Sequence, residues 1–333
     1  MKKEYYVQPY EYNAFADAVI SEHPDYEAWN MNNYIHTFIT NRKHDNGEIY
    51  VDYLSGTVFG LIPILKIEDL SPEKLNDPQQ IYERVKDGIK HGLVYYTFLD
   101  HFYFPFSQEY QRVHDAHDVM ICSLNDNNFG YVENIRGAYH LYTVDEEKLR
   151  ESFLNCKNNC VFELSPDLNN HFEFDIDSFK QMVFDYMNSR KPDDESIYFH
   201  ENGFYSDGFF EPKKTLTVAY GIDAYALLVE YMSKRVESKQ MVDYRGFYLL
   251  REHKHNMIGK LEYLVRHNYL DSEKAEKLIT DFRNIEHRLN LMMCKVVKYD
   301  FKFSADAVEG VAEEMSVLAE EEKRIFADLY KCV

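Results

Sequence analysis

The sequence contains no apolar run that approaches the roughly 20 residues needed to span a bilayer, and its longest, such as 93–99, have the length of a strand. No apolar segment follows the charged N-terminus MKKEYY, so a signal peptide is not expected. Basic residues are in the minority. The 37 Lys and Arg against 57 Asp and Glu give a formal net charge of -20, which argues against a nucleic-acid partner.

Cysteine is scarce, with five residues in a chain of 333. An odd number of cysteines without a signal peptide favours reduced thiols and a cytoplasmic protein. Cys156 and Cys160 have a C-x3-C spacing, but no second pair of ligands follows at the spacing of a zinc site. No metal is therefore expected there.

Aromatic residues are abundant: 28 Tyr and 23 Phe contribute to an aromatic content of 16%, and 45% of the chain is hydrophobic. This composition excludes a disordered chain and is ample for a buried core. It also suggests a cleft lined by tyrosine. The length favours two domains, which we place at 1–165 and 166–333.

The hydrophobic pattern predicts an α+β fold whose first half mixes helices and strands. Asn13 is expected to cap a helix that ends near Ser21, and Thr143-x-x-Glu146 has the form of a capping box that opens another. The remaining predicted elements of this half are a helix at 79–91, strands at 93–99, 119–124 and 129–132, and a hairpin turn at 125–128.

The second half is predicted to be mostly helical. Apolar residues recur at helical spacing from Phe179 to Met187, whereas 191–214 is rich in Pro, Gly and Asp and is expected to be a loop. Two heptad-like stretches, 278–296 and 308–329, predict long helices that form an antiparallel hairpin across 300–304.

Five residues of the first half have the order and spacing of a cysteine-protease-like site. Gln8 precedes a predicted helix and could donate its side-chain N–H to an oxyanion, together with the backbone N–H of Ala14. His117 begins a later strand and could act as the base. Glu133 or Asn134, one hairpin further on, could orient its imidazole, and the choice between them stays open.

This order resembles papain-fold enzymes related to bacteriocin-leader peptidases, and more closely the butirosin biosynthesis protein H-like family. The similarity covers roughly residues 5–155. The segments that carry it are Tyr26-Glu-Ala-Trp29 leading to Asn33-Tyr34-Ile35, Val94-Tyr95-Tyr96 leading to Asp100-x-Phe-Tyr103-x-Pro105, and Tyr110-x-x-x-His114-x-x-His117-Asp118 leading to Asn125-Asp126.

The resemblance implies a papain-like domain with a helical C-terminal domain. It also implies an acyltransferase, or amide synthase, of thiotemplated natural-product biosynthesis, such as nonribosomal peptide assembly; the amide-forming enzyme of closthioamide assembly is a relative. Such enzymes move an acyl group from an acyl or peptidyl carrier protein, through a cysteine, to a small amine. No cofactor is expected, because phosphopantetheine arrives on the carrier protein. Asn13, Asp100 and Tyr103 are candidates for contacting the substrate.

The chain departs from this family at the nucleophile. Ala14 stands six residues after Gln8, where the family has cysteine, and none of the five cysteines precedes residue 122. Either the chain is a natural pseudoenzyme, or a native cysteine has been replaced by alanine. The retention of Gln8, Asn13 and His117 favours replacement.

The residues allow three other interpretations. The same site could belong to a cysteine protease or peptide amidase, or to a non-catalytic binding protein. His114 and His117 could form a metal pair, but their spacing lacks helical geometry and a third ligand, so no metal is expected. An acidic carrier protein would need a basic surface, for which Arg136 and the pairs at 42–43 and 213–214 are candidates.

Overall fold

The computed structural model describes residues 10–41, 49–54, 62–135, 138–191 and 218–333. The chain divides into two compact units. Unit 1 contains the chain up to Tyr26 together with Ile62–Phe172, and unit 2 contains Glu27–Leu61 together with Glu173–Val333. The sequence predicts one boundary near residue 165, whereas the contacts place the change after Phe172 and assign Glu27–Leu61 to the second unit.

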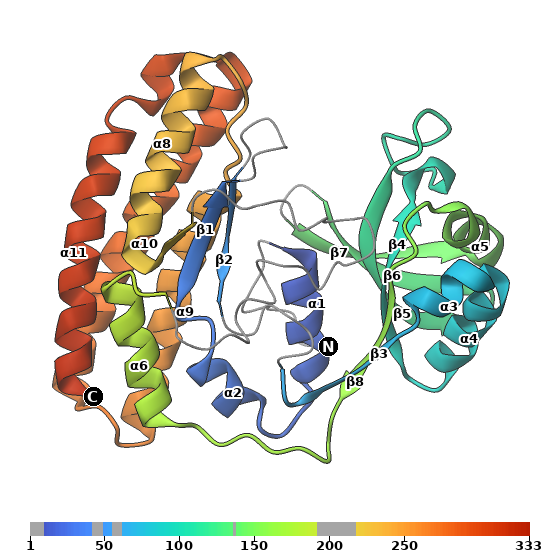
Figure 1. The fold of residues 1–333 in the computed structure, drawn as a ribbon, viewed down its shortest axis with the longest axis horizontal. Helices are drawn as coiled ribbons and strands as arrows, with labels where there is room; N and C mark the ends of the chain where they lie inside the picture. Colours follow the sequence, from blue (N-terminus) through green and yellow to red (C-terminus); the bar gives the residue numbers. More distant parts are fainter. Residues whose placement is uncertain (1–9, 42–48, 55–61, 136–137, 192–217) are drawn as a thin grey trace. The chain divides into compact units, whose positions relative to one another are not determined.

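Unit 1 is built on a six-stranded antiparallel sheet (Figure 1). Its strand order is β3-β8-β4-β5-β6-β7, so the hairpins β4–β5, β5–β6 and β6–β7 lie side by side. The strands are β3 (Leu65–Asp69), β4 (Val94–Asp100), β5 (Ala116–Asn125), β6 (Asn128–Ile135), β7 (Ala138–Asp145) and β8 (Val161–Pro166).

Helices cover both faces of this sheet (Figure 1). On one face, Tyr95, Leu99 and Val119 are buried against α4 (Pro78–Lys90) and α5 (Glu146–Asn155). On the other face lies α1 (Glu11–Ile20), whose Phe15 ring contacts the rings of Tyr96 and Tyr139 at centroid distances of 6.1 and 5.9 Å. Successive side chains of β4 therefore point to opposite faces of the sheet and pack against different helices, as the alternation of a strand requires.

Three smaller elements complete unit 1. They are α3 (Ser71–Asn76) before α4, the one-turn 3-10 helix η2 (His101–Tyr103) after β4, and the tight turn between β5 and β6. In that turn Asn125 pairs with Asn128, and Asp126 takes a positive φ of 54°. A two-residue hairpin loop requires this left-handed backbone, which Asp and Asn tolerate better than most residues.

Unit 2 combines a three-stranded antiparallel sheet of order β2-β1-β9 with long helices. The helices α8 and α9 contact its strands, and α9, α10 and α11 pack in succession. Its elements are α2 (Tyr26–Asn32, which begins at the junction), β1 (Thr37–Asn41), β2 (Ile49–Tyr53), α6 (Ile176–Met187), β9 (Val218–Tyr220), η4 (Gly221–Asp223), α8 (Ala224–Glu237), α9 (Arg245–Arg266), α10 (Ser272–Lys302), η5 (Ala305–Val308) and α11 (Val311–Cys332).

A charged network is fully buried among these helices. Glu322 of α11 forms an ion pair with Lys254 of α9, and both side chains have no exposed surface. The Tyr186 hydroxyl donates to Glu322 Oε1 at 2.6 Å, the Tyr225 hydroxyl donates to Oε2, and Lys254 Nζ also contacts His253 Nδ1 at 2.6 Å. Burial lowers the pKa of Lys254 to about 8 although Glu322 opposes this shift.

Several sequence predictions are confirmed. The helix expected at 79–91 is α4, the three expected strands are β4, β5 and β6, and α10 covers the first heptad-like stretch. The second stretch is helical from Val311, in α11, whereas Val308 ends the 3-10 helix η5. Most of the expected loop at 191–214 lies outside the described residues. In the described part of the chain, no helix is both long enough and apolar enough to cross a membrane.

Two predicted helix starts are wrong. The first helix begins at Glu11 with Tyr10 as its N-cap, so Asn13 lies inside it and does not cap it. Thr143 pairs with Gly130 within β7, and the side chain of Asp145 caps α5 instead by accepting from the Lys148 N–H at 3.0 Å. The strand continues past Thr143 because Thr143 and Val144 still have ladder partners in β6.

Candidate active site at the start of strand β5

The candidate site of unit 1 lies where β5 begins, next to the end of β4. Leu99 of β4 pairs with His117 of β5, and the chain turns into η2 two residues later. The His101 N–H donates to the Asp115 carbonyl at 2.9 Å, which ties this turn to the residue before β5. The His117 side chain is 33% exposed, so its imidazole is within reach of a solute.

The register between β5 and β6 determines which acidic or amide residue accompanies His117. Met120 pairs with Val132. The next residues of β6, Glu133 and Asn134, point to opposite faces, and Glu133 lies on the face of His117. Its Oε1 is 3.5 Å from His117 Nδ1, and its side chain is 2% exposed. The structure therefore brings Glu133 to the imidazole, and Asn134 lies on the other face.

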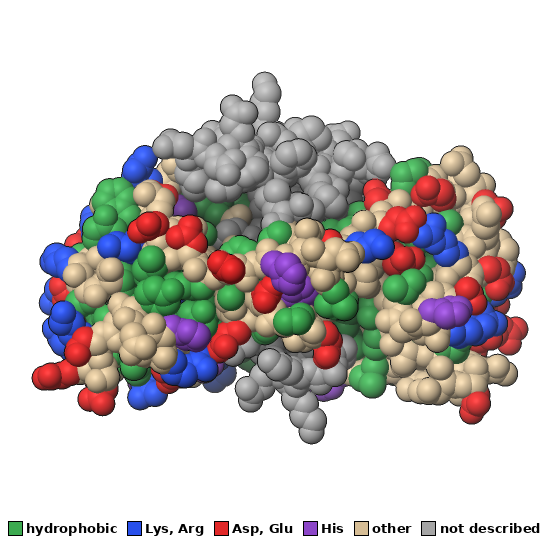
Figure 2. Space-filling view, turned by 90° about the horizontal axis from the view of Figure 1, so that it is seen from below, with side chains coloured by type: hydrophobic (Ala, Val, Ile, Leu, Met, Phe, Trp, Pro, Cys, Tyr) green, Lys and Arg blue, Asp and Glu red, His purple; other side chains and the backbone are tan. Residues whose placement is uncertain are grey.

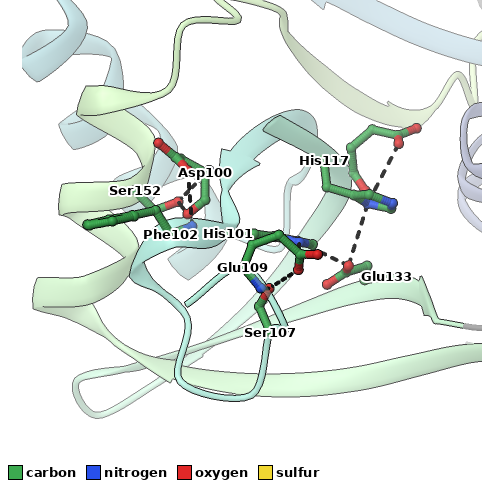
Figure 3. Close-up of polar contacts among 9 residues, drawn as sticks. Asp100, His101, Phe102, Ser107, Glu109, His117, Glu133 and Ser152 are labelled. Carbon is green, nitrogen blue, oxygen red and sulfur yellow. Dashed lines mark hydrogen bonds and ion pairs between the residues drawn. The ribbon is translucent and has the colours of Figure 1, made fainter. Parts of the chain in front are cut away.

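A second histidine, which the sequence reasoning missed, completes this cluster (Figure 3). The rings of His101 and His117 are stacked with centroids 5.0 Å apart and an interplanar angle of 15°. His101 Nε2 is 3.1 Å from the same Oε1 of Glu133. The sequence offered only its position two residues after the predicted strand at 93–99, because its relation to His117 depends on the pairing of Leu99 with His117.

The carboxylates around His101 raise the pKa of its imidazole. Burial lowers the pKa of His101, but contact with Glu133 and the nearby carboxylates of Asp115 and Glu109 outweigh it, so the pKa lies above its ordinary value. Glu109 Oε2 is 4.0 Å from His101 Nδ1. The Ser107 hydroxyl donates to Glu109 and lowers the pKa of that carboxyl.

The predicted substrate residues Asp100 and Tyr103 belong to the turn beside the cluster. Asp100 Oδ1 accepts from the Phe102 N–H at 3.0 Å, and its Oδ2 is 2.7 Å from His114 Nδ1. The ring of His114 stacks on Phe102 with a centroid distance of 4.2 Å. His114 is thus held by Asp100, and the histidine that accompanies His117 is His101.

Ala14 does not occupy the start of its helix. It is the fourth residue of α1, its side chain has no exposed surface, and its N–H donates to the Tyr10 carbonyl at 3.1 Å. The backbone N–H expected to bind an oxyanion is therefore already used within the helix. Phe15 contacts Tyr96, whose partner Met120 lies on the sheet face opposite to that of His117.

Glu11 is the residue of α1 that reaches His117. Single donor atoms of Glu11, His117 and Asp118 all lie within 4.8 Å of one another. Glu11 is also the first residue of the helix, where the helix dipole favours a negative charge. Burial raises the pKa of Asp118, whereas His117 opposes this shift. The structure thus has a carboxylate, not a thiol, at the end of the helix nearest the imidazole.

The cysteines of unit 1 are poor nucleophiles. Burial raises the pKa of Cys122 to about 11, and it also raises the pKa of Cys156 and Cys160 above the ordinary thiol value, with nearby Lys74 opposing the shift in these two. A thiol with a raised pKa carries little thiolate at neutral pH. The three thiols of unit 1 therefore do not replace the missing nucleophile.

Some predicted residues cannot be placed. Gln8, the expected oxyanion donor, lies outside the described residues, as do Arg136 and the pairs at 42–43 and 213–214. On the face seen in Figure 2, acidic and basic side chains of the described residues are interspersed. Asn13 is buried within α1.

Comparison with known proteins leaves this site to be interpreted from its own geometry. No model of a known protein family matches the chain. The search of curated proteins finds no significant match either.

Proposed function

We propose that unit 1 is a papain-like domain of the butirosin biosynthesis protein H-like type that transfers an acyl group from a carrier-protein thioester to a small amine. The observation that carries this proposal is the pair formed by His117 and Glu133. A partly exposed imidazole beside a buried carboxylate is the usual arrangement of a general base and the group that orients it.

Because the described residues of unit 1 around His117 include no thiol, the transfer is direct. The neutral amine attacks the thioester carbonyl while His117 takes a proton from its nitrogen. The new C–N bond forms, the C–S bond breaks, and the imidazolium returns the proton to the leaving phosphopantetheine thiolate. This sequence balances protons and electrons without a cofactor or a covalent enzyme intermediate. Glu133 stabilises the imidazolium that exists between the two transfers.

The charges around His117 favour an amine acceptor. Glu11 and Asp118 lie within 4.8 Å of a His117 ring nitrogen, and Glu133 lies behind it. Carboxylates attract the ammonium form in which most amines arrive at neutral pH, and the ammonium releases one proton to solvent before the neutral amine attacks. They also disfavour an anionic acceptor, such as a free carboxylate.

The test is product analysis by mass spectrometry after the full chain is incubated with acyl-loaded carrier protein and a panel of diamines and amino sugars. We expect an amide that is lost in His117→Ala. Free acid as the sole product would mean that the protein is a thioesterase and does not transfer the acyl group to an amine. Absence of turnover together with binding of the carrier protein would establish the second candidate, a non-catalytic binding protein, which the lack of a thiol among the described residues of unit 1 beside His117 favours.

A further inference from the structure

We propose that His101, His117 and Glu133 form a binding site for one divalent transition-metal ion of the zinc type. The inference goes beyond the proposed function, since it does not require that function to be correct. If the proposed function is correct, this site would also regulate it, because an ion bound to His117 would prevent that residue from acting as the base.

The donor set matches the chemistry of such ions. Two imidazoles and one carboxylate are the protein ligands of a common class of zinc site that leaves one position open. Here one donor atom from each residue lies within 4.8 Å of the other two. Two of these separations are short, at 3.1 Å for His101 Nε2 and 3.5 Å for His117 Nδ1, both to Glu133 Oε1.

In the described part of the chain, one oxygen of the buried Glu133 carboxylate is not hydrogen-bonded. Oε2 of Glu133 is buried and has no hydrogen-bond partner among the described residues, although the side chain is only 2% exposed. A buried carboxylate oxygen without a partner carries a desolvation cost that a cation would remove. Both imidazoles approach Oε1, so neither of them satisfies Oε2.

The surroundings of His101 fit the same interpretation. Glu109 lies on its Nδ1 side, at 4.0 Å, while Nε2 points toward Glu133 (Figure 3). Histidine ligands commonly place their second nitrogen against a carboxylate, which fixes the tautomer and the ring orientation. The Ser107 hydroxyl in turn holds Glu109.

A competing trio shares His117. Glu11, His117 and Asp118 also bring three donor atoms within 4.8 Å, but they offer one imidazole and two carboxylates, and each of these residues is only partly buried. Zinc-type ions favour nitrogen donors more than magnesium-type ions do. The two trios can be separated experimentally, because Glu133 belongs to the first and Asp118 to the second.

The experiment is titration of the chelator-stripped full chain with Co²⁺, followed by visible absorption, and with Zn²⁺, followed by calorimetry. We expect one ion to bind per chain. We also expect the visible absorption bands of the bound Co²⁺ to be those of an ion with a low coordination number. Glu133→Gln and His101→Asn should each weaken binding at least about 10-fold, because both remove a ligand. His114→Asn is the matched control and should change the affinity less than about 2-fold, since His114 is held by Asp100 and does not belong to the trio. Asp118→Asn removes a charge 3.9 Å from His117 Nδ1 and should weaken binding less than Glu133→Gln does, because Asp118 is not a ligand of this trio.

Three results would overturn the proposal: no binding by the wild type, unchanged affinity in Glu133→Gln, or loss of binding in Asp118→Asn. Because the buried variants could unfold, each is checked by circular dichroism, and His117→Asn at the partly exposed position provides a third removal of a ligand. Metal binding is measured without substrate. Metal binding by a chain that has no transferase activity in its metal-free form would therefore refute the proposed function alone, and activity without metal binding would refute this inference alone.

Discussion

His101 and His117 approach the same carboxylate oxygen, Glu133 Oε1, at 3.1 and 3.5 Å, because the pairing of β4 with β5 brings η2, which contains His101, next to the start of β5, which contains His117. A third imidazole, that of His114, is only a few residues away in sequence but is turned to Asp100 instead. This arrangement separates histidines that sequence proximity would group, and it provides a matched control for functional tests.

The first prediction concerns His117 in the proposed acyl transfer. His117→Ala should lower the rate of amide formation by roughly 10²–10⁴, the usual contribution of a general base. His114→Ala should leave the rate close to that of the wild type, because its side chain is 54% exposed and pairs with Asp100. The measurement is amide product against time. Equal rates for His117→Ala and the wild type would remove His117 from the reaction.

The second prediction locates the position at which a thiol would be reactive. A thiol in Ala14→Cys would be buried and should react slowly with iodoacetamide. Glu11→Cys should react faster, with a thiol pKa below the free value of about 8.5, because it begins the helix beside His117. Labelling at each site is measured against pH by peptide mass spectrometry. Faster labelling at position 14 than at position 11 would support the prediction from sequence that the nucleophile stands at position 14.

The third prediction compares two candidate caps of α5. Asp145→Ala should reduce the free energy of unfolding by about 1 kcal/mol, because it removes the side-chain acceptor for the Lys148 N–H. Thr143→Ala changes an exposed strand residue and should cost less than about 0.5 kcal/mol. Denaturant unfolding of both variants decides between them, and a larger loss at Thr143 would support the capping box.

The fourth prediction tests the buried pair of unit 2. Glu322→Gln should lower the free energy of unfolding by about 3–5 kcal/mol, because it leaves the Lys254 ammonium buried without its counter-charge. Adding Lys254→Met should recover much of that loss. A double variant that is less stable than Glu322→Gln alone would show that the ammonium is stabilised by groups other than Glu322.

The fifth prediction concerns pH and Lys74. Burial lowers the pKa of Lys74 to about 8, and its ammonium contacts only the Asn158 carbonyl, at 3.3 Å, and the Phe153 ring, at 3.9 Å to the centroid, among the interactions described. Between pH 8 and the unfolded value of 10.5, the unfolded chain holds more protons at this position, so its contribution to stability rises with pH.

The measurement for Lys74 is the difference in unfolding free energy between the wild type and Lys74→Met. This difference should shift in favour of the wild type by about 1–2 kcal/mol from pH 8 to pH 9.5. Using the difference cancels the titration of the other lysines. A difference that stays constant over this range would mean that Lys74 is protonated to the same degree in the folded and the unfolded chain, so that burial does not lower its pKa.

The sequence predicts local structure better than the site. The strands β4, β5 and β6 and the helix α4 follow from hydrophobic period and turn residues, which are local properties. The choice between Glu133 and Asn134 depends on the register between two strands, because a shift of one residue exchanges the faces. His101 could not be recognised for the same reason, since its relation to His117 exists only through the pairing of Leu99.

The error at the start of α1 has a different cause. Asn13 is a favoured N-cap residue, but the observed N-cap is Tyr10, three residues earlier, and the helix begins at Glu11. Intrinsic preference at one position is a weak signal when packing decides the outcome, and Phe15 and Ala14 are buried whichever residue starts the helix. That shift moved the expected nucleophile position from the end of the helix into its interior.

The interleaving of the two units has a consequence for synthesis on the ribosome. All of unit 1 has been made once Phe172 emerges, but Glu27–Leu61, which belongs to unit 2, must then wait for Glu173–Val333. During that interval the apolar residues of β1 and β2 have neither α8 nor α9 to cover them. Exposed strands of this kind invite pairing with other chains. Slow translation of the second half should therefore increase aggregation, and a nascent chain stalled after residue 172 should bind chaperones through its early segment.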